Sequence, residues 1–180
     1  LLRRGMDPAR LDLRAATPVS VRSRQERGRP GNFVSSWIVP LPVGEPTAAE
    51  RLGAVRRTTL ALKQGRAELA IDTLFGISEL LPEAVLSLAM RAAPRSANLL
   101  VTNVPGPQFP LYQLGARLLG MYPLAPCLPR SGLAVALFSY DGKLCWGFNA
   151  DAERIPDLGE LAREIDAAYR DLATLALVER

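Results

Sequence analysis

The sequence predicts an α/β (α+β) fold, a two-layer sandwich in which helices pack on a mixed β-sheet. Short runs rich in Val, Ile, Phe and Trp are bounded by turn residues, as strands are. Two other stretches carry apolar residues at helical spacing behind capping signals. Because an amphipathic helix needs a surface to cover, this combination favours layered sheet and helix.

The composition is typical of a single globular domain, residues 1–180. At 48% hydrophobic and 22% charged, the chain is long enough to bury one core. No apolar run approaches the ~18 residues that cross a bilayer. We therefore expect a cytoplasmic protein, free or peripheral at a membrane or lipid-droplet surface.

The opening residues Leu1 to Arg4 are typical of a helix end, which predicts a piece of a longer protein.

The chain contains no histidine, and this excludes several kinds of chemistry. Ser-His and Cys-His nucleophile pairs and histidine metal sites are impossible within it. A general base would have to be a carboxylate, a perturbed lysine or a group supplied from elsewhere. The sequence predicts no metal and no cofactor.

The net charge of +4 is confined to one segment. Residues 1–31 hold eight arginines against three acidic residues, so the rest of the chain carries a net charge of −1. The basic segment lacks the interleaved aromatics and base-reading modules of nucleic-acid binders, which argues against nucleic acid as a partner. We interpret it as a solvated loop, with a phosphate-attracting rim as the functional alternative.

The first half of the chain predicts two strands. Residues 17–21 alternate, and Pro18 favours an edge position or a strand start. Residues 32–41 form a second, more apolar run that stops at Pro42.

Helices are predicted next. Thr47 and Glu50 form a capping box, and apolar residues then recur at helical spacing until Gly65. Residues 66–77 and 78–92 predict two further helical stretches.

A central strand is predicted at residues 98–103, a short apolar run typical of a strand buried on both faces. Pro105 and Pro107 flank a glycine, so we expect the strand to end before them in a rigid turn. Residues 111–124 predict another strand pair that turns near Gly115.

The last third predicts a hairpin and a helix. The pair Asp141-Gly142 between the alternating runs 133–140 and 143–149 favours a type I′ turn, with Leu144, Trp146 and Phe148 on one face. Asp157 is an N-cap, and apolar residues from Leu158 to Leu175 follow at helical spacing.

Several short segments form an ordered set, although each alone is weak. They are RAATPVSVR at 14–22, Gly31-Asn32, Leu41-Pro42, Glu45-Pro46, Glu50-Arg51-Leu52, Asn98 with TNVPGP at 102–107, Gly132-Leu133, SYDGKL at 139–144, Gly147, Asp151 and Pro156-Asp157. Together they resemble the carboxyl-terminal domain of the wax ester synthase/diacylglycerol acyltransferase (WS/DGAT) family over essentially the whole chain.

The resemblance implies the chloramphenicol acetyltransferase-like fold of CoA-dependent acyltransferases, in which two α/β halves enclose a tunnel. This chain would be the carboxyl-terminal half. The family's catalytic signature, two histidines followed by three residues and Asp-Gly, belongs to the amino-terminal half, which is the implied partner. Asp141-Gly142 is not its tail, because no histidine precedes it. The implied reaction moves a fatty acyl group from acyl-CoA, a substrate, to diacylglycerol or a long-chain alcohol.

Under this resemblance no catalytic residue is expected in the chain, only residues that line the tunnel. The candidate substrate-binding residues are Asn98, Thr102, Asn103, Gly106, Ser139 and Tyr140. For Asn103 a structural role, bonding neighbouring backbone groups, is an equal alternative. For Ser139 and Tyr140 core packing is the first interpretation, because alternation puts one of the two into the core. Arg22 and Asn32 are the candidate CoA-binding residues, with a structural role as the first interpretation.

A second function stays open, a non-catalytic lipid-binding or interaction module that retains the fold. Acyl length, acceptor preference and oligomeric state are not predicted. An isolated half would expose its tunnel wall, so we expect it to form homodimers or to aggregate.

Overall fold

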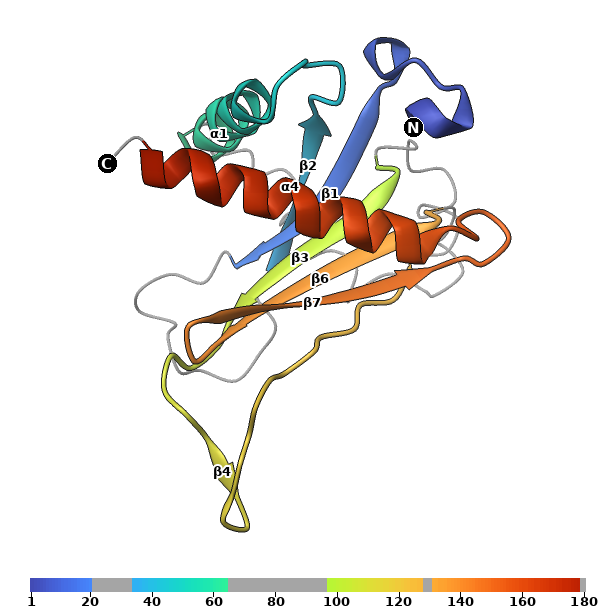
Figure 1. The fold of residues 1–180 in the computed structure, drawn as a ribbon. Coiled ribbons are helices and arrows are strands. Elements are labelled where there is room, and N and C mark those ends of the chain that lie inside the picture. Colours follow the sequence, from blue (N-terminus) through green and yellow to red (C-terminus); the bar gives the residue numbers. More distant parts are fainter. Residues whose placement is uncertain (21–33, 65–96, 128–130, 179–180) are drawn as a thin grey trace, which may run out of the picture.

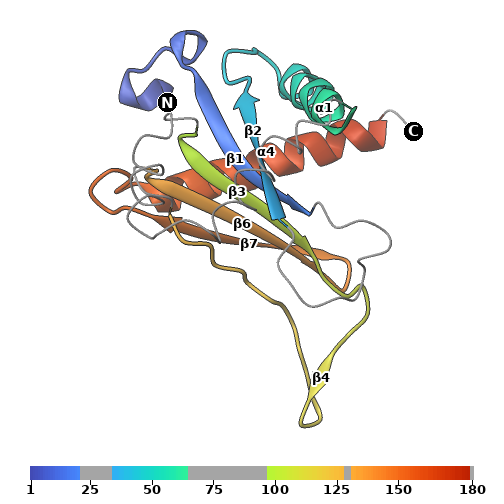
Figure 2. The same cartoon turned by 180° about the vertical axis from the view of Figure 1, so that it is seen from behind.

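The computed structural model describes residues 1–20, 34–64, 97–127 and 131–178. These residues form a mixed five-stranded sheet in the order β2-β1-β3-β6-β7, with helices α1 and α4 on one face (Figure 1, Figure 2). The strands are β1 (Leu13–Ser20), β2 (Val34–Leu41), β3 (Leu99–Pro105), β6 (Leu133–Tyr140) and β7 (Lys143–Ala150), and the helices are α1 (Ala48–Gln64) and α4 (Leu158–Val178). Two short 3-10 helices, Leu2–Arg4 and Pro8–Arg10, come first. The predicted mixed α/β architecture is confirmed.

The capping box at the start of α1 forms as predicted. Thr47 Oγ1 accepts a hydrogen bond from the Glu50 backbone N–H at 3.2 Å, and Glu50 Oε2 accepts one from the Thr47 N–H at 3.1 Å. Each residue thus satisfies a donor that the helix end leaves open. The predicted stop at Gly65 and the stretches 66–77 and 78–92 lie outside the described residues.

Two expectations about the central strand are wrong. β3 does not end before the prolines but runs through Pro105, which pairs with Ser139 of β6. β1 pairs with β3 at Leu99 and Leu100 and then diverges from it. Pro105 is tolerated because it is the last residue of β3, where the ladder with β6 ends. β3 is also not buried on both faces. Asn103, Val104 and Pro105, which lie beyond the point where β1 diverges, are exposed.

β6 and β7 form the predicted hairpin, paired from Leu133 with Ala150 to Tyr140 with Lys143. Asp141 and Gly142 adopt φ values of 47° and 74°, as a type I′ turn requires. The ring centroids of Trp146 and Phe148 lie 6.1 Å apart on the side that faces α4, as the alternation predicts.

Residues 106–119, here called the arm, leave the sheet and project from the body of the domain (Figure 1). The predicted strand pair is present only at its tip, as β4 (Tyr112–Gln113) and β5 (Ala116–Arg117). Residues 118–124, expected to belong to the second strand, contain no strand.

Residues 120–127, the return segment, run back over the sheet face opposite the helices. Asn149 of β7 donates a hydrogen bond from Nδ2 to the Ala125 carbonyl at 3.3 Å. Ala125 joins a buried cluster whose other members are Ala16, Leu100, Ala134 and Ala136. The cluster consists mainly of small side chains because here a backbone segment, and not a helix, lies against the sheet.

The first residues of the chain are tied to the start of α4. The carboxylate of Asp157, the predicted N-cap, forms an ion pair with Arg4, while Arg3 reaches Glu164 at 2.8 Å. The Asp157 carbonyl accepts the first helical hydrogen bond, from the Glu160 N–H at 2.9 Å. Hydrogen bonding from Arg4 lowers the pKa of Asp157 below its ordinary value.

We expect the pair between Arg4 and Asp157 to stabilise the fold only while the carboxylate is ionised. A pKa lowered by folding gives stability above the unfolded pKa of about 4, and this stability is lost as the pH falls through the folded pKa. The melting temperatures of the chain and of Asp157→Asn, which keeps a good N-cap, should differ at neutral pH and converge in strong acid. A gap that is constant across the titration would contradict this.

Candidate substrate-binding edge at the ends of β3 and β6

The carboxyl ends of β3 and β6 meet at one edge of the sheet, where the arm begins. The two strands are parallel and pair along all of β3. Ligands bind most often at such edges of α/β sheets, because the strand ends leave backbone groups and side chains uncovered. Five of the predicted residues lie at this edge, namely Thr102, Asn103, Gly106, Ser139 and Tyr140.

A hydrogen-bond network fixes the turn that follows β3. Ser139 Oγ accepts hydrogen bonds from the Gly106 N–H at 3.2 Å and from Gln108 Nε2 at 3.1 Å. Gln108 Nε2 also donates to the Gly106 carbonyl at 2.9 Å, and Gln108 Oε1 accepts from the Gly142 N–H at 3.2 Å. Gln108 thus joins the arm to the β6–β7 turn.

No sequence pattern predicted the role of Gln108 in this turn. The sequence signal that could have indicated this role is the position of Gln108, a polar side chain directly after a Pro-Gly-Pro turn. That signal does not name the partners Ser139 and Gly142, which are more than thirty residues away along the chain.

Gly106 is required by a close approach between backbones. A Cβ at this position would overlap the Ser139 carbonyl oxygen and the Phe138 ring. A glycine therefore lets the turn lie directly on the end of β6. Its contribution to the edge is to fix the geometry of its neighbours.

Asn103 is the most accessible polar side chain of the predicted set at this edge. It is exposed, and its amide makes no hydrogen bond within the part of the chain that the structure describes. Its backbone is nevertheless fixed, because Asn103 pairs with Leu137, which in turn pairs with Trp146 of β7. By alternation its side chain points to the side of the sheet that carries α4.

Thr102 and Tyr140 lie on the opposite face of the sheet from Asn103 and Ser139. Thr102 is half-buried, and Tyr140 is 0% exposed. The Tyr140 hydroxyl accepts a hydrogen bond from the Leu111 N–H at 2.7 Å and donates one to the Leu118 carbonyl at 3.0 Å. In this structure Tyr140 holds the base of the arm and offers no surface to a ligand.

Asn98 lies at the opposite end of β3 from Asn103, roughly 17 Å away at the rise of an extended strand. Its Oδ1 accepts a hydrogen bond from the Arg14 N–H at 2.7 Å, and its own N–H donates to the Arg14 carbonyl at 2.8 Å. Asn98 thus extends the pairing of β1 with β3. The structure does not bring it together with the other predicted residues.

The candidate CoA-binding residues Arg22 and Asn32 lie outside the described residues. Among the residues that are described, no cluster of three or more potential metal ligands occurs. At the edge itself the polar side chains are neutral hydrogen-bond donors. Two of them, Ser139 and Gln108, already hydrogen-bond each other. Chemically these neutral groups can orient and polarise a carbonyl group, but an amide or hydroxyl of this kind does not act as a proton acceptor at neutral pH.

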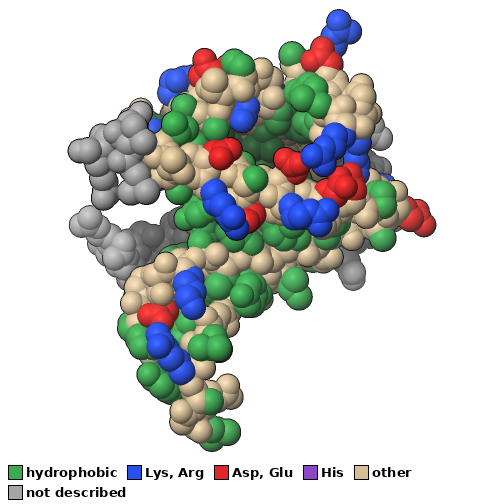
Figure 3. Space-filling view, in the orientation of Figure 1, with side chains coloured by type: hydrophobic (Ala, Val, Ile, Leu, Met, Phe, Trp, Pro, Cys, Tyr) green, Lys and Arg blue, Asp and Glu red, His purple; other side chains and the backbone are tan. Residues whose placement is uncertain are grey.

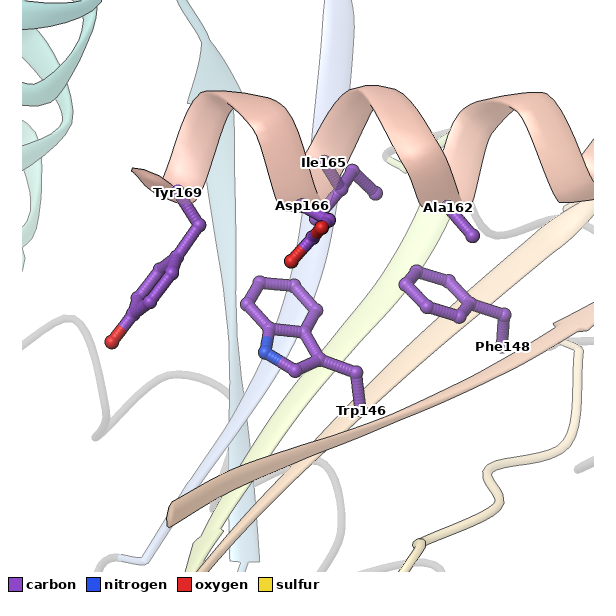
Figure 4. A pocket seen from close by; sticks show the side chains of 6 residues that line it. All are labelled: Trp146, Phe148, Ala162, Ile165, Asp166 and Tyr169. Atoms are coloured by element: carbon purple, nitrogen blue, oxygen red, sulfur yellow. The ribbon is translucent and has the colours of Figure 1, made fainter. Parts of the chain in front are cut away.

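A mostly apolar pocket of about 170 Å³ lies between β7 and α4, on the face of the sheet to which Asn103 points. It is lined by Trp146, Phe148, Ala162, Ile165, Asp166 and Tyr169 (Figure 4). The one carboxylate, that of Asp166, pairs with Arg170 at 2.7 Å. Trp146 is two strands from Asn103, which is roughly 10 Å at the usual strand spacing.

Comparison with known proteins decides the family. Residues 30–173 match the WS/DGAT C-terminal domain. The chain belongs to this family. The WS/DGAT domain described here is 34% identical over 180 residues to tgs1 of Mycobacterium tuberculosis H37Rv, named a diacylglycerol O-acyltransferase. It is 31% identical over 182 residues to a second protein of that strain with the same kind of name, Rv1760.

These matches cover 98% and 96% of this chain but only 39% and 35% of the two relatives. The domain thus spans about two fifths of their length. The WS/DGAT of Marinobacter aquaeolei VT8 superposes with a TM-score of 0.68 at 24% identity, over 98% of this chain and 39% of that one. This likeness confirms the chloramphenicol acetyltransferase-like fold.

Proposed function

We propose that the WS/DGAT domain is the carboxyl-terminal half of an acyl-CoA-dependent O-acyltransferase and forms one wall of its substrate tunnel. The enzyme would transfer a fatty acyl group to diacylglycerol or a long-chain alcohol, giving triacylglycerol or wax ester. Support comes from the relatives named diacylglycerol O-acyltransferases, of whose length this domain spans about two fifths. An amino-terminal half would supply the histidine that this chain lacks.

The observation that carries the proposal is the amide of Asn103, which is exposed and makes no hydrogen bond to any residue in the described ranges. When a hydroxyl oxygen attacks a thioester, negative charge develops on the carbonyl oxygen, and a preplaced hydrogen-bond donor stabilises it. Asn103 Nδ2 is such a donor on a backbone fixed by Leu137 and by the turn at Gly106. An amide cannot accept the hydroxyl proton, so this step needs the histidine of the other half.

The proposed reaction divides the chemistry between the two halves. The histidine takes the acceptor's hydroxyl proton, the oxygen forms a bond to the thioester carbon, and the carbon–sulfur bond then breaks. The proton goes to the departing CoA thiolate. Asn103 would hold the carbonyl oxygen throughout, and the apolar pocket lined by Trp146 and Phe148, on the same face of the sheet, would receive part of the acyl chain. Arg22 and Asn32 remain candidates for the CoA phosphates.

We also propose a cytoplasmic location at a membrane or lipid-droplet surface, because the acceptors are insoluble in water. Among the described residues, no helix is long and apolar enough to span a bilayer.

The test is an acyl-transfer assay on the full-length protein that carries this domain. With labelled palmitoyl-CoA and either diacylglycerol or hexadecanol, we expect labelled ester and free CoA thiol in equal amounts. Alanine in place of the upstream histidine should abolish both products, and the 180-residue chain alone should form neither. Ester formation by the isolated chain would overturn the proposal.

A non-catalytic lipid-binding module is the second candidate, favoured by the large apolar side chains that this domain exposes. It predicts that the full-length protein binds lipid vesicles but forms no ester with any acceptor. Both functions allow vesicle binding, so the ester assay separates them, and vesicle flotation then shows whether a protein that forms no ester still binds lipid.

A further inference from the structure

One row of side chains joins Asn103 to the pocket between β7 and α4. Asn103 of β3 pairs with Leu137 of β6, and Leu137 pairs with Trp146 of β7. Paired residues point to the same face of a sheet, so all three side chains lie on the face that carries α4. Leu137 is half-buried, which leaves part of its side chain open. An apolar step therefore lies between the polar edge and the pocket.

The floor of the pocket is flat and aromatic. The rings of Trp146 and Phe148 lie 6.1 Å apart, and their planes are 17° from parallel. Figure 4 shows both rings facing α4, with Ala162 next to Phe148. In the view of Figure 3, hydrophobic side chains show along the flank of α4 that faces β7, whereas charged side chains lie on its outer surface. An apolar surface of this kind suits an alkyl chain, which has no hydrogen-bonding group to satisfy.

Ala162 is the residue that leaves space in this pocket. Ile165 and Tyr169 lie on the same side of α4, three and seven positions further on, and both are larger. The space between this wall and the two rings is about 170 Å³. An apolar cavity of about 150 Å³ holds a benzene molecule, so the pocket has room for roughly six carbon atoms.

The distance from Asn103 decides which carbons of an acyl chain would enter. Trp146 lies roughly 10 Å from Asn103. An extended covalent chain advances about 1.2 Å per bond. With the thioester carbonyl at Asn103, roughly the first eight carbons would lie along Leu137 and about the next six would fill the pocket. An octanoyl group therefore ends where the pocket begins, whereas a palmitoyl group fills it.

One rim of the pocket is charged. Asp166 lines it and pairs with Arg170 at 2.7 Å, and both side chains are mostly exposed. Carbons that extend past this rim would meet hydrated charges and gain no burial. Chains longer than palmitoyl should therefore bind no better than palmitoyl itself.

We propose that this pocket selects long fatty acyl groups and that Ala162 is the residue that sets their length. The inference rests on the proposed function, because it needs a thioester held at Asn103. It names the acyl donor as a chain of roughly 14 to 16 carbons. Ala162 affects specificity alone, since it lies on the pocket wall and away from the reacting atoms.

The test is Ala162→Phe in the full-length protein, with hexadecanol as acceptor and acyl-CoA kept below its micelle concentration. The added ring would displace roughly three carbons, and each buried carbon is worth about a factor of four in binding. We expect kcat/KM for palmitoyl-CoA to fall roughly 60-fold, while that for octanoyl-CoA stays unchanged. Ala167→Phe, at an exposed position on the side of α4 away from the pocket, is the matched control and should change neither value.

A second measurement needs neither a variant nor ester formation. Palmitoyl-CoA analogues that carry a photoreactive diazirine at carbon 3 or at carbon 10 are irradiated with the unaltered full-length protein, and the labelled peptides are mapped. We expect the carbon-10 probe to label the β7 or α4 peptide and the carbon-3 probe to label neither. If Ala162→Phe does not fold, this labelling decides the question.

Several outcomes would overturn the proposal. These are labelling by the carbon-10 probe outside the pocket, an equal fall for palmitoyl-CoA and octanoyl-CoA in Ala162→Phe, and a changed preference among alcohols of different length. The last result would assign the pocket to the acceptor. Labelling of the pocket without ester from any acyl-CoA would refute the proposed function and leave the chain selection intact. Ester formation with labelling elsewhere would do the reverse.

Discussion

Alanine in place of Gly147 is expected to lower the melting temperature of the domain by roughly 6–12 °C, corresponding to about 3 kcal/mol. A Cβ on Gly147 would overlap the carbonyl oxygen of Pro123 in the return segment. Backbone cannot rotate away as a flexible side chain can, so the return segment has to lift off the sheet. Ala125 would then leave the buried cluster.

The matched control for this change is Gly159→Ala in α4. There a Cβ meets only the far end of the Arg163 side chain at 3.9 Å, and alanine favours helix over glycine. We expect its melting temperature to stay or to rise slightly. If Gly147→Ala had the same melting temperature as the unaltered chain, the return segment would not lie against β7.

Alanine in place of Asn103 is expected to reduce kcat of the full-length enzyme about 100-fold, the loss typical of removing one oxyanion donor. The melting temperature should not change, because the side chain is exposed and has no hydrogen bond among the described residues. KM for acyl-CoA should change little, since the donor acts on charge that appears only in the transition state. Initial rates at varied acyl-CoA and a thermal melt measure both quantities.

Asn98→Ala is the control, because it removes the same side chain from the other end of β3. It leaves the Arg14 N–H without its acceptor, so we expect a loss of about 1 kcal/mol in stability with kcat unchanged. If Asn103→Ala instead lowered stability and turnover together, the structural interpretation of Asn103 would be correct.

Local signals in the sequence predicted the elements that depend on neighbouring residues. Thr47 and Glu50 form the capping box, and Asp141-Gly142 turns the hairpin, because each needs only groups within a few positions. The alternation also placed Trp146 and Phe148 on one face. The family followed from the order of such segments along the chain.

Predictions that depended on distant residues were less successful. β3 was expected to stop before Pro105 because a proline removes a donor, but Pro105 is the last residue of the ladder with β6, where one missing donor is tolerated. The candidate substrate-binding residues were treated as one set. The pleat sends Thr102 and Asn103 to opposite faces, and the pairing of β1 places Asn98 at the far end of the strand.

The sequence alone determined the family, the mixed α/β fold and the absence of a histidine base, because composition and ordered local patterns carry that information. Only the tertiary structure decided which polar side chains share an edge, that Tyr140 is occupied in holding the arm, and that Leu114 stands uncovered. These properties arise from contacts between residues far apart in the chain, and no local pattern encodes them.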